Sequence, residues 1–241
     1  MTVNWNIFGA SVRGPGHVRT SMPDQDAFTV FYRIWGSGAV VSDGVGSCPK
    51  SQYGSAAACR AVVHAAKSWV KKERGMDAFL SSIHSKWLSG IQPFVPRECA
   101  ATCLFAICPR QANRLQLGMI GDGLIAVLKK DGSYHELCED KGDCFSNQTD
   151  SLSAHTQAGQ WQTACLNQDE CRAVLLCTDG VADDLLPERR ADFLRHIYEQ
   201  GKSRPKTKLR LEVRTMLENW PVPKHSDDKT LVCLCNFEEK P

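Results

Sequence analysis

The sequence predicts an α+β fold in which a core of β-strands lies between layers of helices. Apolar segments of strand length outnumber the helical patterns. The helical patterns occur in pairs, which disfavours a parallel sheet of βαβ units and favours strands sandwiched between helical layers. We expect residues 1–241 to form a single domain, because one layered core of about 250 residues is common.

Eight apolar segments have the length of strands, and several are rich in Val, Ile, Phe and Cys. In chain order they are residues 6–12, 26–34, 38–43, 100–108, 114–121, 124–130, 172–179 and 229–235. Asp131-Gly132 lies between exposed lysines and a polar strand, so we interpret it as a plain hairpin turn.

Four segments have the periodicity of helices. Residues 55–72 and 77–88 carry apolar side chains at helical spacing, and Gly75 separates them. A third helix follows Pro187, and a fourth spans about residues 209–220 before the sequence PVP stops it.

The composition limits the classes of function. The net charge is +2, from 29 basic and 27 acidic residues, so we expect no nucleic acid and no membrane surface as partners. The N-terminal segment has no basic leader, and no apolar run approaches the roughly 18 residues that span a bilayer. These features predict a cytoplasmic protein.

The twelve cysteines are scattered singly, mostly within apolar runs, and they form no CxxC pair. This pattern is typical of buried free thiols. A structural zinc site would need ligands clustered at short spacings, so we do not expect one.

Four aspartates occur where apolar strands begin or end. Asp43 and Asp179 end predicted strands. Asp122 lies between two glycines, and Asp227 precedes the last strand. One such aspartate is usually a turn former, whereas four in one core can converge. Converging carboxylates repel one another unless a cation neutralises them, and oxygen ligands favour Mg²⁺ or Mn²⁺.

Two further aspartates extend this set. Asp26 immediately precedes a strand, as Asp227 does. Asp183 lies four residues after Asp179, where it would either cap the helix after Pro187 or reach back to the same centre. The sequence leaves both possibilities open.

In this order, the acidic motifs resemble the metal-dependent type 2C protein Ser/Thr phosphatases, and especially their bacterial members. Six motifs match over nearly the whole chain: Gln25-Asp26-Ala27, Asp43-Gly44 with Gly46, Ala101-Thr102, Gly121-Asp122, Thr178-Asp179-Gly180 with Asp183, and Asp227-Asp228 with Thr230. The N-terminal segment at 11–28 also resembles the bacterial subgroup.

The resemblance implies a four-layer α-β-β-α sandwich with two central, mainly antiparallel sheets. It also implies hydrolysis of phosphoserine and phosphothreonine in proteins by a water that bridges two Mn²⁺ or Mg²⁺ ions. The expected partners are phosphorylated Ser/Thr proteins and a kinase that opposes the enzyme in signalling.

The resemblance assigns the first ions to the central aspartates. Asp43 would bridge two ions, and Gly44 would offer its carbonyl oxygen. Asp179 and Asp227 would hold the first ion. With Asp43, these two aspartates form the expected catalytic set.

The second ion would be supported by the Gln25-Asp26 pair, and Asp122 and Asp183, with Asp179, resemble a weaker third-metal site. Family members usually have a glutamate where Gln25 stands. A neutral amide would bind the second ion more weakly than a carboxylate.

Two other positions depart from the family pattern. Val45 stands where many members have a histidine as general acid, so water or another group must protonate the leaving oxygen. Ser21 stands where the phosphate-binding arginine is usual. Arg19, His17 and Arg13 are nearby candidates for substrate binding, unless they are solvated loop residues.

Two alternative functions remain open. A phosphatase-like domain with weak or no activity would bind phosphoproteins or a regulatory partner through the same fold. A metal-dependent hydrolase of nucleotides or small phosphoesters would use the same ligands. A cysteine-nucleophile phosphatase is disfavoured, because the chain has no Cys-x5-Arg loop.

Overall fold

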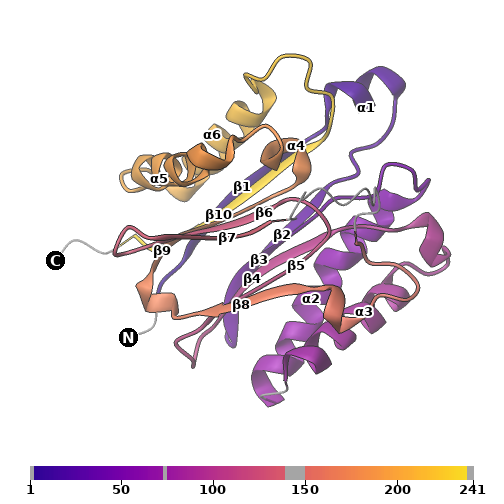
Figure 1. Ribbon diagram of the computed structural model, residues 1–241, viewed down its shortest axis with the longest axis horizontal. Coiled ribbons are helices and arrows are strands. Elements are labelled where there is room, and N and C mark those ends of the chain that lie inside the picture. The colour runs from indigo at the N-terminus through magenta and orange to yellow at the C-terminus, as the bar shows by residue number, and fades with distance from the viewer. Residues whose placement is uncertain (1–2, 73–74, 139–149, 238–241) are drawn as a thin grey trace.

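The computed structural model describes residues 3–72, 75–138 and 150–237. Within these residues the strands form two five-stranded sheets, and all neighbouring strands are antiparallel (Figure 1). Sheet A has the order β1 (Asn6–Val12), β10 (Lys229–Cys235), β9 (Cys171–Cys177), β6 (Leu124–Lys129) and β7 (Tyr134–Cys138). Sheet B has the order β2 (Ala27–Arg33), β3 (Gly36–Ser42), β4 (Cys103–Pro109), β5 (Leu115–Ile120) and β8 (Gln162–Leu166).

Helices cover the outer face of each sheet. Helices α2 (Ser51–Lys72) and α3 (Met76–Gly90) lie on sheet B, whereas α5 (Arg190–Gly201) and α6 (Lys206–Glu218) lie on sheet A (Figure 1). The short elements are α1 (Pro15–Thr20), η1 (Pro96–Glu98), η2 (Ala158–Gln160), η3 (Gln168–Glu170), α4 (Asp179–Ala182) and η4 (Pro187–Arg189). The predicted four-layer α-β-β-α sandwich is confirmed.

The central strands are apolar throughout because both of their faces are buried. In β3, Ala39 and Val41 belong to the apolar layer between the two sheets, while Val40 packs on the α2 and α3 side. In β10, Val232 faces the other sheet and Cys233 faces α5 and α6. The period-two alternation of a strand therefore divides each apolar run between two cores.

The main differences from the sequence prediction lie at exposed elements. The four helices occur as expected, although α2 begins at Ser51 rather than at residue 55. Strand β8 was not among the predicted strands, because it is an edge strand of sheet B with mostly exposed or half-buried side chains. The short helix α1 has no buried residue and gave no periodic signal.

The cysteines within the described residues are free, and most of them are buried. Burial raises the pKa of the Cys59 thiol to about 12. This agrees with the prediction of buried free thiols; Cys144 lies outside the described residues. None of the helices in the described ranges has both the length and the apolar character that a membrane span requires.

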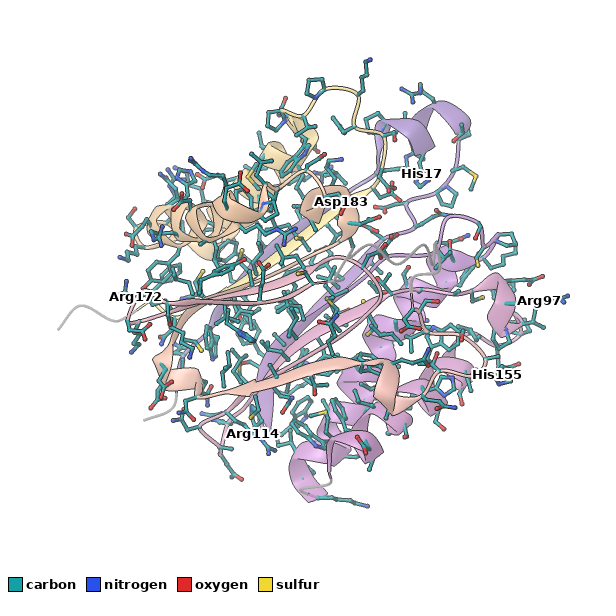
Figure 2. All side chains as sticks on the ribbon, viewed as in Figure 1. His17, Arg97, Arg114, His155, Arg172 and Asp183 are labelled. Carbon is teal, nitrogen blue, oxygen red and sulfur yellow. The ribbon has the colours of Figure 1, made fainter. Side chains whose placement is uncertain are left out.

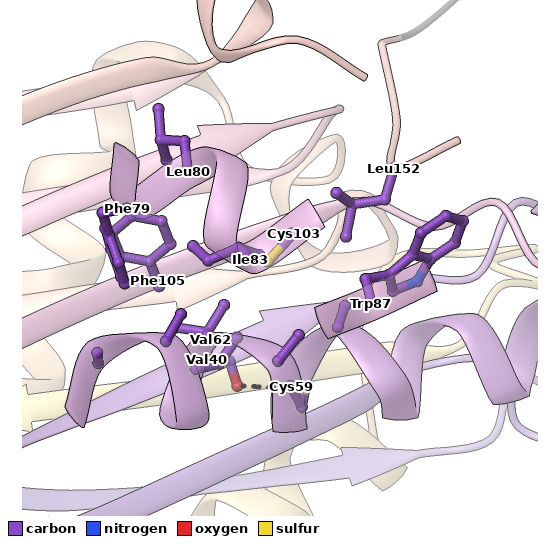
Figure 3. Packing of buried hydrophobic residues seen from close by; sticks show 14 of the residues in the cluster. Val40, Cys59, Val62, Phe79, Leu80, Ile83, Trp87, Cys103, Phe105 and Leu152 are labelled. Carbon is purple, nitrogen blue, oxygen red and sulfur yellow. Dashed lines mark hydrogen bonds between the residues drawn. The ribbon is translucent and has the colours of Figure 1, made fainter. Parts of the chain in front are cut away.

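The contact between α2 and α3 is fixed by Trp87, whose side chain is completely buried (Figure 3). Its Nε1–H donates a hydrogen bond to the carbonyl oxygen of Gly54 at 3.1 Å. Gly54 in turn lies so close to Cys99 that an added Cβ would meet the Cys99 oxygen at 1.8 Å. Trp87 thus holds α3 on α2, and α2 follows the loop that begins at Asp43.

We expect Trp87→Ala to lower the free energy of unfolding by about 3–5 kcal/mol, because it leaves a cavity and removes the hydrogen bond to Gly54. Urea unfolding of the purified protein measures the loss. Ser85→Ala, an exposed position on the same helix, is the matched control. A loss below about 1 kcal/mol for Trp87→Ala would contradict the assigned packing role.

Candidate metal centre

The register of sheet B places two aspartates side by side at one end of its strands. Ala27 pairs with Ser42, so Asp26 and Asp43 lie just beyond the paired residues of β2 and β3. The backbone N–H of Asp43 donates to Thr102 Oγ1 at 2.9 Å. The hydroxyl before β4 therefore fixes the start of the loop that carries Asp43.

Sheet A presents three more aspartates at the same end. The end of β9 pairs with the beginnings of both β6 and β10. Asp179 follows β9, Asp122 precedes β6 and Asp227 precedes β10. Gly121 and Gly123 flank Asp122 with φ angles of 94° and 113°, a conformation that favours glycine.

The carboxylates of the two sheets converge. Asp43, Asp122 and Asp179 each offer an oxygen atom, and these atoms lie within 4.8 Å of one another. Asp26 shares a hydrogen bond with Asp43 and accepts a second one from Thr178 Oγ1 at 2.9 Å. Thr178 belongs to the sheet A side, so this bond also links the two sheets.

Burial and mutual repulsion make these carboxyl groups hard to ionise. Burial raises the pKa of Asp26 to about 8. Burial, followed by the negative charges of Asp26 and Asp179, raises the pKa of Asp43 well above its ordinary value. For Asp179, burial and then the charges of Asp122 and Asp227 raise the pKa to about 7.

This donor set fits a hard divalent cation. The converging groups offer oxygen ligands only, as Mg²⁺ and Mn²⁺ prefer. The raised pKa values show that several ionised carboxylates in one place are unfavourable without a neutralising charge. A cation bound among them would supply that charge.

A cavity of about 420 Å³ opens over the carboxylates. Asp227 is exposed but lines this cavity, and its Oδ1 accepts the backbone N–H of Asp228 at 2.9 Å. Gly44 and Val45 line it as well. Gly44 packs so closely on α2 that an added Cβ would lie 2.7 Å from the Cβ of Ser51.

Gln25 is buried and also lines the cavity, although much of its contact with the protein is through its backbone. Its carbonyl oxygen accepts hydrogen bonds from Ser55 Oγ at 2.6 Å and from the Gly44 N–H at 3.1 Å. These contacts hold the Gln25-Asp26 segment against α2.

The remaining predicted site residues occupy different places. Asp183 is exposed at the C-terminal end of α4, where it contributes to raising the pKa of Asp179 but does not line the cavity (Figure 2). Among the three candidates for substrate binding, His17 lines the cavity. Arg19 is exposed on α1, and Arg13 donates to the carbonyl oxygen of Met22 at 3.3 Å.

Two acidic residues near the centre had no assigned role in the sequence analysis. Asp228 is buried, and its carboxylate contacts His17. Asp24 accepts the backbone N–H of Asp26 at 3.0 Å. The sequence signal that could have indicated them is their position in the chain, because each lies within two residues of a predicted metal ligand.

Comparisons with known proteins agree on the fold. The sequence model of the family protein phosphatase 2C matches residues 13–218. A crystal structure of a bacterial serine phosphatase is similar with a TM-score of 0.67 and 14% identity, covering 99% of this chain and 100% of that chain. A search of curated protein sequences finds no match.

Two further structures are similar over nearly their whole length. The photosystem II phosphatase PBCP matches with a TM-score of 0.66 and 15% identity, covering 96% of this chain and 98% of that chain. RsbX in complex with magnesium matches with a TM-score of 0.61 and 13% identity, covering 97% of this chain and 98% of that chain. At these identities the likeness establishes the fold.

We expect Asp179→Asn to stabilise the metal-free protein increasingly as the pH rises. The folded-state pKa of Asp179 is raised to about 7 from 3.8, so its stabilising contribution is complete below about pH 4 and is lost as the pH rises through 7. Asparagine does not ionise, so the variant does not lose this stability as the pH rises. The Tm difference between variant and wild type in EDTA should grow by a few degrees from pH 5 to 8, at about 2–4 °C for each kcal/mol.

Asp77→Asn, at an exposed position in the first turn of α3, is the control for removing one carboxylate. Thermal unfolding followed by circular dichroism gives both differences. A Tm difference for Asp179→Asn that does not change with pH would refute the electrostatic account of this cluster.

Proposed function

Because the chain belongs to the protein phosphatase 2C family, we propose that it hydrolyses phosphoserine and phosphothreonine in proteins with Mn²⁺ or Mg²⁺ as cofactor. One observation carries the proposal: Asp43, Asp122 and Asp179 come from both sheets and bring carboxylate oxygens within 4.8 Å of one another. Divalent cations relieve the repulsion in such a cluster.

In this proposal the central aspartates hold the first ions. Asp43, the carbonyl oxygen of Gly44, Asp179 and Asp227 would hold these ions. Bound ions would lower the pKa of a water molecule and offset the negative charge of the phosphate. Asp43 and Asp179 are half-buried and line the cavity, so their oxygens are accessible to an ion.

Gln25 and Asp26 would support the second ion. Hydrogen bonds to Asp43 and Thr178 hold Asp26 in place. Asp122 and Asp183, with Asp179, would form a weaker third position. The exposure of Asp183 makes that position the most open to solvent.

The substrate enters the cavity of about 420 Å³ above these residues. His17 is the cavity-lining member of the three candidates for substrate binding, so it is the side chain proposed to contact the bound phosphoester. Arg13 and Arg19, the other two candidates, are exposed and carry positive charge. That charge favours the approach of an anionic substrate.

We also propose that residues 1–241 form one domain. The pairing of β1 near the start with β10 near the end, where Asn6 lies opposite Cys235, supports this. A cytoplasmic phosphatase of this kind acts in signalling against a kinase that phosphorylates the same proteins.

The purified protein should hydrolyse p-nitrophenyl phosphate and a phosphothreonine peptide only when Mn²⁺ or Mg²⁺ is present. Dialysis against EDTA should abolish turnover, and the added ions should restore it. Asp43→Asn should lower kcat by a factor of about 100 or more at saturating metal, because it removes a shared ligand.

The wild-type measurement also separates the alternative functions. Binding of a phosphopeptide with no turnover at saturating metal indicates an inactive phosphatase-like domain. Turnover of nucleotides in preference to phosphopeptides indicates a small phosphoester hydrolase. Undiminished activity after chelation, or in Asp43→Asn, would refute the proposed centre.

Gln25→Glu should tighten binding of the second ion. A carboxylate adds a full negative charge at a buried position, where solvent screens it poorly. The Mn²⁺ concentration for half-maximal activity should fall about tenfold, which corresponds to about 1.4 kcal/mol. Calorimetric titration of Mn²⁺ provides a readout that does not depend on activity.

Asp26→Asn is the companion variant for this test. If Gln25 contacts the protein through its backbone alone, the metal midpoint of Gln25→Glu stays unchanged while Asp26→Asn is inactive. That combination would remove Gln25 from the ligand set and keep Asp26.

A further inference from the structure

Asp228 is a buried carboxylate at the start of β10 that is held firmly in place. Its side chain is 1% exposed, and it accepts backbone N–H groups from Gly14 and Gln25, both at 2.7 Å. His17 Nδ1 lies 2.9 Å from Asp228 Oδ2. Asp24 shares a hydrogen bond with Asp228. His17 is the basic side chain in this group.

The start of α1 and the residue before it pack against the loop before β10, and this contact fixes the position of His17. The Gly16 N–H donates to the carbonyl oxygen of Ser226 at 2.8 Å. A Cβ added to Gly14 would lie 2.3 Å from the carbonyl carbon of Asp227, and one added to Gly16 would lie 2.7 Å from the Ser226 oxygen. These glycines permit a contact that any side chain would prevent.

His17 therefore contacts both Asp228 and the cavity. Its buried Nδ1 lies 2.9 Å from Asp228 Oδ2, an ion-pair distance without hydrogen-bond geometry. The residue also lines the cavity that contains Asp43 and Asp227. Within the described ranges, no hydrogen bond engages Nε2 on the opposite side of the ring. An imidazole oriented by a buried carboxylate through one nitrogen can exchange a proton through the other.

The side chain next to Gly44 cannot donate a proton to the leaving oxygen. Val45 lines the cavity there, and its side chain has no donor. Serine and threonine alkoxides are poor leaving groups. Protonation of the leaving oxygen therefore raises the rate of hydrolysis, typically by a factor of about 10²–10⁴.

We propose that His17, positioned by Asp228, is the general acid that protonates the leaving serine or threonine oxygen. This inference rests on the proposed phosphatase function and adds a residue to it. Water adds to phosphorus and releases one proton to solvent, while the bond from phosphorus to the side-chain oxygen breaks. The electron pair of that bond stays on the oxygen, which takes the proton from His17 Nε2. The neutral imidazole regains a proton from solvent after the alcohol and phosphate leave.

The competing interpretation is that His17 only contacts the phosphate. The two roles differ in how they depend on the leaving group. A phosphate contact supports every phosphomonoester to a similar extent. A general acid matters for alkyl esters such as phosphothreonine, and matters far less for p-nitrophenyl phosphate, whose leaving group is stable as an anion.

The test compares His17→Gln with the wild type at saturating Mn²⁺ on a phosphothreonine peptide and on p-nitrophenyl phosphate. The ratio of kcat on the peptide to kcat on p-nitrophenyl phosphate should fall about 100-fold. Asp228→Asn should lower the same ratio by a smaller factor, because it misplaces the histidine without removing it. His64→Gln, at an exposed position on α2, is the matched control and should leave the ratio unchanged.

A leaving-group series on the wild-type protein adds a measurement that requires no variant. With His17 as general acid, kcat depends weakly on the basicity of the leaving oxygen across aryl and alkyl phosphates. A steep dependence in the wild type would overturn the assignment. An equal loss on both substrates in His17→Gln, with a raised KM, would overturn it in favour of a phosphate contact.

The outcomes separate this proposal from the function on which it rests. Absence of wild-type turnover on both substrates refutes the phosphatase function and the general acid together. Wild-type turnover of the peptide with an unchanged ratio in His17→Gln refutes only the role of His17.

Discussion

Apolar side chains such as Val41, Leu104, Val174 and Val232 fill the space between the two sheets, and the position of every strand end follows from this contact. Face-to-face packing brings together the strand ends of the two sheets. Asp43 follows a strand of sheet B, and the aspartates of sheet A lie after β9 and before β6. The carboxylates then converge without a dedicated metal-binding loop. The helices on the outer faces complete the burial of strands that are apolar on both sides.

The same packing creates an electrostatic conflict at the candidate metal centre. Partial burial of the carboxyl groups of Asp26, Asp43 and Asp179 reduces their contact with water and raises their pKa values. Ionising all of them at neutral pH opposes folding unless a cation is present. Hydrogen bonds from Thr178 and from the Gly180 N–H offset part of this cost. Such local destabilisation is typical of functional sites.

A second polar centre joins the two ends of the chain beside the first. The backbone before α1 approaches the loop before β10 closely because Gly14 and Gly16 lack side chains. Asp228 then binds backbone groups of the N-terminal region and contacts His17. This contact brings His17 to the cavity of the candidate metal centre, although His17 and the aspartates belong to different loops.

The sequence by itself determined the strand-rich core, the paired helices and the strand-end aspartates, because apolar periodicity and Asp-Gly motifs are local properties of the chain. It did not reveal the edge strand β8, whose exposed side chains give little apolar signal. Only the tertiary structure decided that Asp183 lies outside the cavity and that His17 meets Asp228. Periodicity reports which face of an element is buried, whereas the distance between side chains far apart in sequence depends on strand register and on the packing of the two sheets.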